Sequence, residues 1–358
     1  MIPLVLAAEI RGTDVPFVVR LSSTAETEDD GLLRQTDQNT LVVSHGRARA
    51  RIVGTDPTPL LGDIVLLDPA RSTMQRLIRA GSRHNTFLVT ERCDQLCVMC
   101  SQPPKKTHHD NFLHFERAAL LAPRHAVLGF SGGEPTLYKR QLFDLLDRVH
   151  VKRPDLRFHV LTNAQHFSEG DIPFLASSAG KTVQWGVPLY APDAALHDDI
   201  VGKQGAFDAL LNGLAILCRA AASVELRTVL TSMNAPVLPS LAHFITRFVP
   251  FAAPWAIMQL ERIGYASNRW NELFFDSSAN FGQVAEAIDI ARLSEIPTLL
   301  YNFPLCTVPS EYRVFAPATI SDWKNKFLEV CEGCNLRSSC GGFFAWHTDQ
   351  AYSRLEPQ

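Results

Sequence analysis

The feature that most constrains the fold of this chain is a regular alternation of strand-like and helix-like segments from Phe87 onward. Helical patterns such as Leu142, Leu145, Leu146 and Val149 recur at the spacing of one helix face. The strand-like runs between them are short and apolar or β-branched: residues 87–90, 126–130, 157–163, 182–190, 224–231 and 255–261. Six βα units in about 200 residues predict an α/β fold with a parallel sheet and helices outside it.

Alternating polar residues within these strands favour a barrel over an open sheet. The run 224–230 sets Val224 and Leu226 on one face and Glu225 and Arg227 on the other. A doubly wound open sheet buries both of its faces, so its strands are continuous apolar runs. A polar inner face instead indicates a lumen that holds a polar ligand.

The run 255–261 is expected to repeat the pattern, with Gln259 and Glu261 together on one face. We therefore predict a partial (β/α)6 TIM-like barrel. The alternative is an open sheet with a few half-polar edge strands, because alternation over so few residues is a weak signal.

The chain is expected to contain three domains. Residues 1–82 hold short β-branched or apolar runs separated by Gly, Asp and Pro, which predicts a small β-rich domain with strands near 15–21, 40–44 and 63–67. Residues 83–265 form the predicted barrel. Residues 266–358 contain one more helix, one more strand and a group of cysteines.

Composition excludes several classes of protein. The chain has 358 residues, of which 46% are hydrophobic, so it can bury a large core. Its net charge is −3 and its Lys and Arg residues are scattered, which argues against a nucleic-acid partner. No stretch approaches the roughly 18 apolar residues that span a bilayer, and the start lacks the basic region of a signal peptide. We therefore expect a cytoplasmic protein without a membrane partner.

Three cysteines follow the first strand-like run. Cys93, Cys97 and Cys100 are spaced C-x3-C-x2-C. This spacing suits one face of a [4Fe–4S] cluster, whose irons normally take four thiolates. Zinc is the alternative, but it usually takes four ligands in two separated pairs. On parallel βα scaffolds the reactive groups lie after the carboxyl ends of strands. The triad therefore predicts a cluster with one iron open to another ligand.

A second motif follows the second strand. In Gly132-Gly133-Glu134-Pro135, the paired glycines allow a close approach to the backbone and the proline ends the strand. Alone, such a pair usually marks only a turn. Together with the three cysteines it makes residues 85–265 resemble the radical S-adenosylmethionine (radical SAM) superfamily.

This resemblance implies a SAM-binding [4Fe–4S] cluster that gives a 5′-deoxyadenosyl radical, which abstracts hydrogen from a substrate. It also implies that Gly132, Gly133, Glu134 and Pro135 contact the amino group of SAM. Met99 takes the position that is often aromatic in the family, and its thioether is expected to pack near the adenine ring.

Two further SAM contacts are expected. Asn163 ends the third strand and resembles the polar strand tip of the family. Arg227 is expected to meet the SAM carboxylate in a charge-assisted pair. The alternative for Arg227 is an ion pair with Glu225 or Glu261.

The second cysteine group combines Cys331, Cys334 and Cys340, spaced C-x2-C-x5-C, with Cys306 upstream. By spacing alone, structural zinc and an iron–sulfur cluster compete. Behind a radical SAM barrel, the group resembles the auxiliary-cluster (twitch or SPASM-like) domains of radical SAM peptide maturases. Phe344 stands where a two-cluster version has another cysteine, so the resemblance implies one auxiliary [4Fe–4S] cluster held by these four residues. The alternative is that Cys306 is not a ligand and the open site binds the substrate.

The remaining cysteine, Cys218, follows a helical stripe of Phe207, Leu210, Leu211 and Leu214 by one turn. We expect it to be a buried apolar residue.

Several stretches resemble, more narrowly, the His-Xaa-Ser system maturases: residues 88–105, 301–309, 321–325 and 340–344. This resemblance implies an enzyme that modifies a ribosomally synthesised precursor peptide (a RiPP). Its expected partners are an electron donor such as flavodoxin or ferredoxin and a partner maturase. Residues 1–82 are then expected to bind a leader segment by strand addition. The alternatives are a radical SAM enzyme acting on a small molecule and a non-catalytic iron–sulfur or zinc scaffold.

Overall fold

The computed structural model describes residues 4–54, 58–347 and 352–355. The chain divides into two compact units. The first comprises Met1–Val89, His109–Ser131 and Tyr138–His159, and the second comprises Thr90–His108, Gly132–Leu137 and Val160–Gln358. The predicted domain boundaries near residues 82 and 265 remain a prediction.

The first unit begins with an eight-stranded sheet in the order β1-β8-β7-β3-β4-β5-β6-β2. Its strands are β1 (Val5–Ala7), β2 (Glu9–Arg11), β3 (Phe17–Ser22), β4 (Asp30–Asp37), β5 (Thr40–His45), β6 (Ala48–Val53), β7 (Ile64–Asp68) and β8 (Thr73–Ile78). Val19, Leu41, Ile52, Val65 and Leu67 are among the buried residues of its core. The β-rich character predicted for this region is confirmed, and five of these strands were not predicted.

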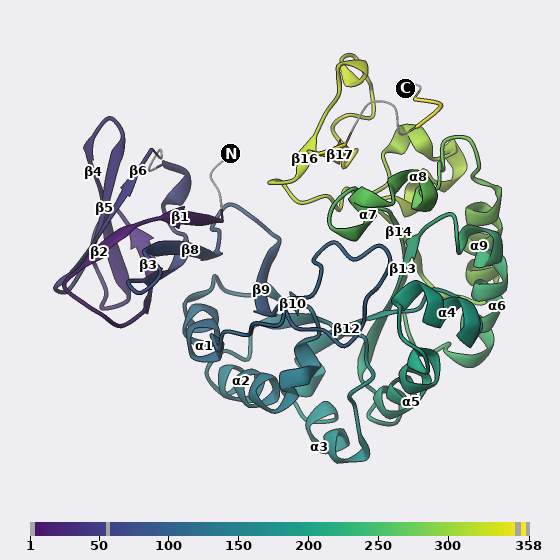
Figure 1. The fold of residues 1–358 in the computed structure, drawn as a ribbon, viewed down its shortest axis with the longest axis horizontal. Coiled ribbons are helices and arrows are strands. Elements are labelled where there is room, and N and C mark those ends of the chain that lie inside the picture. The colour runs from purple at the N-terminus through teal and green to yellow at the C-terminus, as the bar shows by residue number, and fades with distance from the viewer. Residues whose placement is uncertain (1–3, 55–57, 348–351, 356–358) are drawn as a thin grey trace. The chain divides into compact units, whose positions relative to one another are not determined.

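One N-terminal segment supplies both outermost strands of this sheet. β1 pairs with β8, and β2 pairs with β6, with only Ala8 between β1 and β2 (Figure 1). Strand addition requires an edge whose N–H and C=O groups are unpaired. Leader binding by strand addition at β6 or β8 would therefore compete with this segment.

The rest of the first unit packs around aromatic residues. Phe87 of β9 (Asn85–Thr90) stacks on Phe115 of α1 (Phe112–Leu121) with ring centroids 5.0 Å apart, and it meets the edge of Phe130 in β10 (Val127–Gly132). In α2 (Lys139–Lys152), the predicted stripe of four apolar residues is fully buried. The helix periodicity read from the sequence is thus confirmed.

The strands β9 to β15 follow one another in chain order in a seven-stranded sheet. After β10 these are β11 (Arg157–Leu161), β12 (Val183–Pro188), β13 (Ser223–Leu230), β14 (Trp255–Gln259) and β15 (Thr298–Tyr301). The pairings from β12 to β15 are parallel. The mixed α/β fold is confirmed, and closure into a partial barrel remains a prediction.

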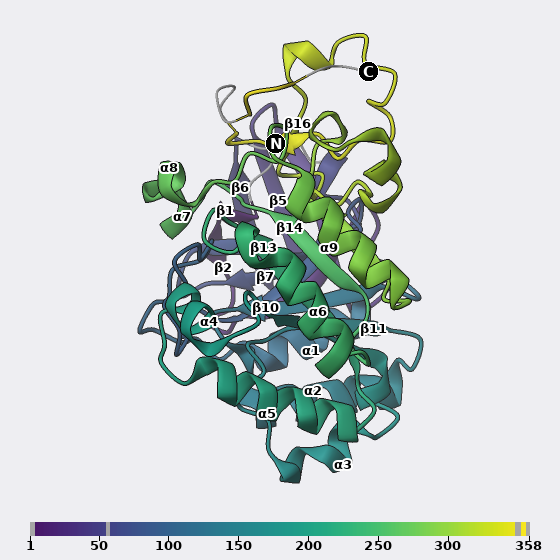
Figure 2. The ribbon, with the colours of Figure 1, turned by 90° about the vertical axis from the view of Figure 1, so that its right-hand side faces the viewer.

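The second unit also contains α3 (Ile172–Leu175), α4 (Ala194–Val201), α5 (Ala206–Arg219), α6 (Leu238–Phe248), α7 (Tyr265–Asn268), α8 (Trp270–Leu273), α9 (Gly282–Leu293), β16 (Asn325–Lys326) and β17 (Phe343–Phe344). Helices α6 and α9 lie side by side (Figure 2). Among the described residues, no helix combines the length and apolar character needed to cross a membrane.

Strand register corrects one prediction about the polar face. Gly186 pairs with Glu225 and Pro188 with Arg227, so these positions share one face, as predicted. Gln259, however, pairs with Leu230 and lies on the opposite, apolar face from Arg227. Its amide is buried and only half satisfied: Nε2 donates a 3.0 Å hydrogen bond to the carbonyl of Phe275, whereas Oε1 has no partner among the described residues.

Cys218 is exposed, so the prediction of a buried cysteine is wrong. The buried stripe of α5 continues from Leu210 through Leu214 to Leu217. Successive residues of a helix are rotated by about 100°, so Cys218 lies to one side of this stripe.

Candidate functional site

The three cysteines of the first motif lie on one loop, Thr90–His108, within the second unit. The segment Gly132–Leu137 of the same unit packs against the start of this loop. Gly133 donates its N–H to the carbonyl of Thr90 at 2.7 Å. A Cβ atom on Gly132 would lie 2.1 Å from the oxygen of Thr90, and one on Gly133 would lie 2.1 Å from the oxygen of Arg92. Glycine is therefore required at both positions for the motif to approach the loop.

The carboxyl end of α4 holds the middle of the loop. Leu96 donates its N–H to the carbonyl of Val201 at 3.0 Å, and Val98 donates to Ile200 at 2.9 Å. Gly202 ends the helix in the left-handed conformation with φ of 65°, and a Cβ there would lie 2.6 Å from the oxygen of Leu96. Two separate segments of the second unit thus hold the cluster loop.

The three thiols are partly buried and close enough to influence one another. Burial raises the pKa of Cys93 to about 11. Burial, followed by repulsion from Cys100 and Cys93, raises the pKa of Cys97 to about 12. Iron ligation requires thiolates, and the cationic irons of a cluster would offset both effects. The three residues therefore fit the predicted cluster.

Met99 lies in an apolar cluster beside the loop. It is buried together with Tyr190, Leu260 and Trp270. Its predicted contact with adenine remains a prediction.

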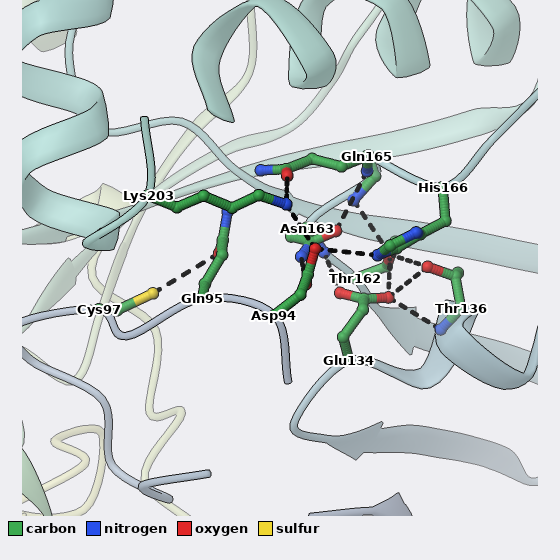
Figure 3. Close-up of polar contacts among 11 residues, drawn as sticks. Asp94, Gln95, Cys97, Glu134, Thr136, Thr162, Asn163, Gln165, His166 and Lys203 are labelled. Atoms are coloured by element: carbon green, nitrogen blue, oxygen red, sulfur yellow. Dashed lines mark hydrogen bonds and ion pairs between the residues drawn. The ribbon is translucent and has the colours of Figure 1, made fainter. Parts of the chain in front are cut away.

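Glu134 ties the glycine motif to the end of β11 (Figure 3). Its carboxylate accepts hydrogen bonds from the backbone N–H of Thr136 at 2.8 Å, the hydroxyl of Thr162 at 2.7 Å and the backbone N–H of Asn163 at 2.6 Å. Burial raises the pKa of Glu134, and these hydrogen bonds oppose the rise. Both carboxylate oxygens already have protein donors. Pro135 is buried and begins a short 3-10 turn (Pro135–Tyr138).

Asp94 joins the cluster loop to two distant segments, and the sequence analysis missed it. Its carboxylate accepts hydrogen bonds from Asn163 Nδ2 at 2.9 Å and from Lys203 Nζ at 2.5 Å, and it lies 3.3 Å from His166 Nε2 (Figure 3). Burial alone would raise the pKa of Asp94, but hydrogen bonds from His166 and Lys203 hold it well below its usual value. The one sequence signal for this role of Asp94 was the position of an acidic residue inside the cysteine motif.

Asn163 lies where the sequence analysis placed it, at the tip of β11. Its side chain contacts the cluster loop through Asp94 and also accepts the N–H of Gln165 at 3.1 Å. Its contact with SAM remains a prediction.

Arg227 forms an ion pair with Glu225, which was the alternative to its predicted contact with SAM. Its guanidinium pairs with Glu225 and lies 5.7 Å from the ring centre of Tyr301. Glu261 instead pairs with Lys324 at 3.1 Å. The SAM contact of Arg227 therefore remains a prediction.

The second group of cysteines converges on one cavity. Cys306, Cys331, Cys334 and Cys340 all line it, together with Leu305 and Phe343. Burial, then repulsion from the other three thiols, raises the pKa of Cys306 to about 12.

The sulfur of Cys340 accepts N–H groups of Leu305 at 3.4 Å and of Gly342 at 3.3 Å. Across the described part of the chain, no three or more His, Cys, Asp or Glu side chains are grouped as ligands of a single metal ion. A [4Fe–4S] cluster takes its four thiolates on four different irons, so the four thiols that line this cavity fit its donor set.

Residues 87–239 match the model of the radical SAM superfamily. No match was found among curated proteins. Of the solved structures, the chain is similar to Streptococcus suis SuiB bound to S-adenosylmethionine, at 16% identity and a TM-score of 0.49, over 60% of this chain and 49% of that chain. It thus spans about half the length of SuiB.

The chain is also similar to native anSMEcpe with bound AdoMet and the Cp18Cys peptide, at 15% identity and a TM-score of 0.49, over 60% of this chain and 62% of that chain. A domain of pyruvate-formate lyase-activating enzyme from Bacteroides vulgatus ATCC 8482 is similar at 14% identity and a TM-score of 0.38, over 48% of this chain and 96% of that domain.

Proposed function

We propose that this chain is a radical SAM enzyme that modifies a ribosomally synthesised precursor peptide, as a maturase of the His-Xaa-Ser type with one auxiliary [4Fe–4S] cluster. The observation that carries the proposal is the cluster loop, which contains the three cysteines and whose start packs against the Gly132-Gly133 segment in the second unit. When bound, the cluster and SAM supply a 5′-deoxyadenosyl radical that abstracts hydrogen from the substrate.

The residues of the chain hold and orient these groups. Cys93, Cys97 and Cys100 would ligate the first cluster and leave one iron open. Gly132 and Gly133 let the backbone approach the loop, and Glu134 locks that segment to the end of β11. These contacts would keep SAM and the cluster in fixed relation, which is the protein's part in such chemistry.

The peptide substrate is supported by two features of the chain. The stretches 88–105 and 301–309 resemble the His-Xaa-Ser maturases. The four distal cysteines line one cavity and would hold an auxiliary cluster, which would supply an acceptor for an electron from the modified peptide.

Anaerobic reconstitution followed by iron and zinc analysis tests the two cysteine sites. Two [4Fe–4S] clusters require about eight irons per chain, and one cluster requires about four. We expect Cys97→Ala and Cys334→Ala each to lose about half of the iron. Cys218→Ala is the matched control, because Cys218 is exposed and lies in neither group. About four irons with one zinc in the wild type would contradict the auxiliary cluster.

Turnover with dithionite and SAM then tests the activity. We expect 5′-deoxyadenosine to form faster when a His-Xaa-Ser precursor peptide is added. A rate that ignores the peptide would favour a small-molecule substrate. No 5′-deoxyadenosine from protein with an intact first cluster would contradict the proposal and favour a non-catalytic scaffold.

A further inference from the structure

A second cavity lies beside the auxiliary cysteines and has no role in the proposed function. It contains about 590 Å³ of empty space, part of which is open to solvent. The lining includes Ser277, Phe281, Cys306, Val308, Arg313 and Arg354. All of these residues belong to the second unit.

Two arginines give this cavity a positive charge. The Nε atom of Arg313 donates to the carbonyls of Leu305 at 3.1 Å and Val308 at 3.0 Å, which anchors its guanidinium in the wall. Arg354 is exposed, and within the described residues its guanidinium has no hydrogen bond or ion pair. An arginine fork of this kind matches the two oxygens of a carboxylate.

A buried hydroxyl without a partner also lines the cavity. Ser277 is only 1% exposed, and its Oγ has no hydrogen-bond partner among the described residues. Buried polar groups nearly always have such a partner, so this hydroxyl is a donor available to a ligand.

The nearest acidic residue in sequence does not use these donors. The carboxylate of Asp276 accepts hydrogen bonds from the backbone and hydroxyl groups of Ser278 and Ser353. Arg313, Arg354 and Ser277 therefore remain available to an external anion.

We infer that this cavity binds a carboxylate carried on a short apolar stem, with Arg313, Arg354 and Ser277 as donors. Phe281 and Val308 line the cavity and offer apolar surface to the stem. The carboxylate can come from the C-terminus of a peptide or from an acidic side chain. Because Cys306 lines both cavities, the bound group would lie beside the auxiliary cysteine site. Its use as an anchor for the precursor peptide rests on the proposed function, whereas the carboxylate site itself does not.

Calorimetric titration of the full reconstituted chain tests the site without SAM or a precursor. The probes are N-acetyl-leucine, its neutral amide, and the α-amide of N-acetyl-glutamic acid. The first carries an α-carboxylate and the third carries only a side-chain carboxylate, so they separate the two sources. We expect at least one acid to bind, and the neutral amide to bind at least about tenfold more weakly than that acid.

Variants then assign the donors. Arg354→Gln should weaken binding of the acid about tenfold, and Ser277→Ala should weaken it about threefold. Arg247→Gln is the matched control, because Arg247 is an exposed arginine in the last turn of α6 and does not line the cavity. Arg354→Lys, which keeps the charge, should retain part of the affinity. Unchanged melting temperatures would show that the variants fold.

Equal binding of N-acetyl-leucine and its amide would overturn the inference, and so would undiminished binding to Arg354→Gln. A failure to detect binding of either acid would overturn it as well. Since none of these readouts involves SAM cleavage, a failure of the proposed function would leave them unaffected.

Discussion

At the residue scale, a few side chains order the cluster loop. Asp94 lies next to Cys93 and receives hydrogen bonds from Asn163 and Lys203, which come from other parts of the second unit. Its side chain is 25% exposed, so these interactions are only partly screened by water. We therefore attribute to Asp94 the alignment of the loop on which the cysteines lie.

Replacing Asp94 with Asn should lower the free energy of unfolding by about 1–3 kcal/mol at pH 7, because it leaves Lys203 without its anion. The pKa of Asp94 is lowered in the folded state, so its contribution is present above the unfolded pKa of about 4 and is lost as pH falls below that value. Urea denaturation from pH 7 downward should therefore show the difference between wild type and variant shrinking below about pH 4. Asp199→Asn, at an exposed position of α4, is the control. A constant difference across this range would contradict the assignment.

Gly132→Ala should destabilise the protein by about 2 kcal/mol or more and reduce the iron retained after reconstitution. The added Cβ would meet the carbonyl oxygen of Thr90, and φ of 141° is strained for alanine. Iron analysis and thermal unfolding measure the two effects. Gly282→Ala is the matched control, because a Cβ there meets no atom within 4 Å. Full iron content in Gly132→Ala would refute the packing argument.

At the element scale, a buried polar contact joins neighbouring strands of the second unit. Thr228 of β13 donates its hydroxyl to the carbonyl of Leu189 at 2.6 Å and accepts the indole N–H of Trp255, in β14, at 2.9 Å. Both side chains are fully buried. The hydroxyl therefore satisfies two buried groups at once.

Thr228→Val keeps the shape of the side chain but leaves the indole N–H and the carbonyl without this partner. We expect the free energy of unfolding to fall by about 1–3 kcal/mol, measured by urea denaturation. Thr228→Ser retains the hydroxyl and should lose less. An equal loss in both variants would show that packing of the methyl group, and not the hydrogen bonds, explains the effect.

At the scale of the whole molecule, the two cysteine groups belong to the same compact unit. Metal bound only by the folded state stabilises that state by mass action. We expect removal of iron by a chelator to lower the melting temperature of the reconstituted wild type by roughly 5 °C or more. The same treatment should have a smaller effect on a Cys97→Ala, Cys334→Ala double variant. Equal effects on both proteins would mean that the iron is not held at these sites.

The sequence by itself determined the order of the βα elements and the two cysteine groups. These are local properties: helix and strand periods show within about ten residues, and ligand spacing shows within a loop. The same local reasoning missed β4 (Asp30–Asp37), which is largely polar and is held by pairing with β3 and β5. It also failed for Cys218, which lies about 100° around the helix axis from the buried Leu217.

Only the tertiary structure decided which polar groups meet. Asp94 and Lys203 are 109 positions apart in the chain, and nothing local links them. Glu261 pairs with Lys324, 63 positions away, and Arg227 pairs with its close neighbour Glu225. One cavity is lined by Arg313, Arg354 and Ser277 because distant segments pack together. A charged side chain near several groups of opposite charge takes its partner according to distance and burial, and the packed structure alone fixes both quantities.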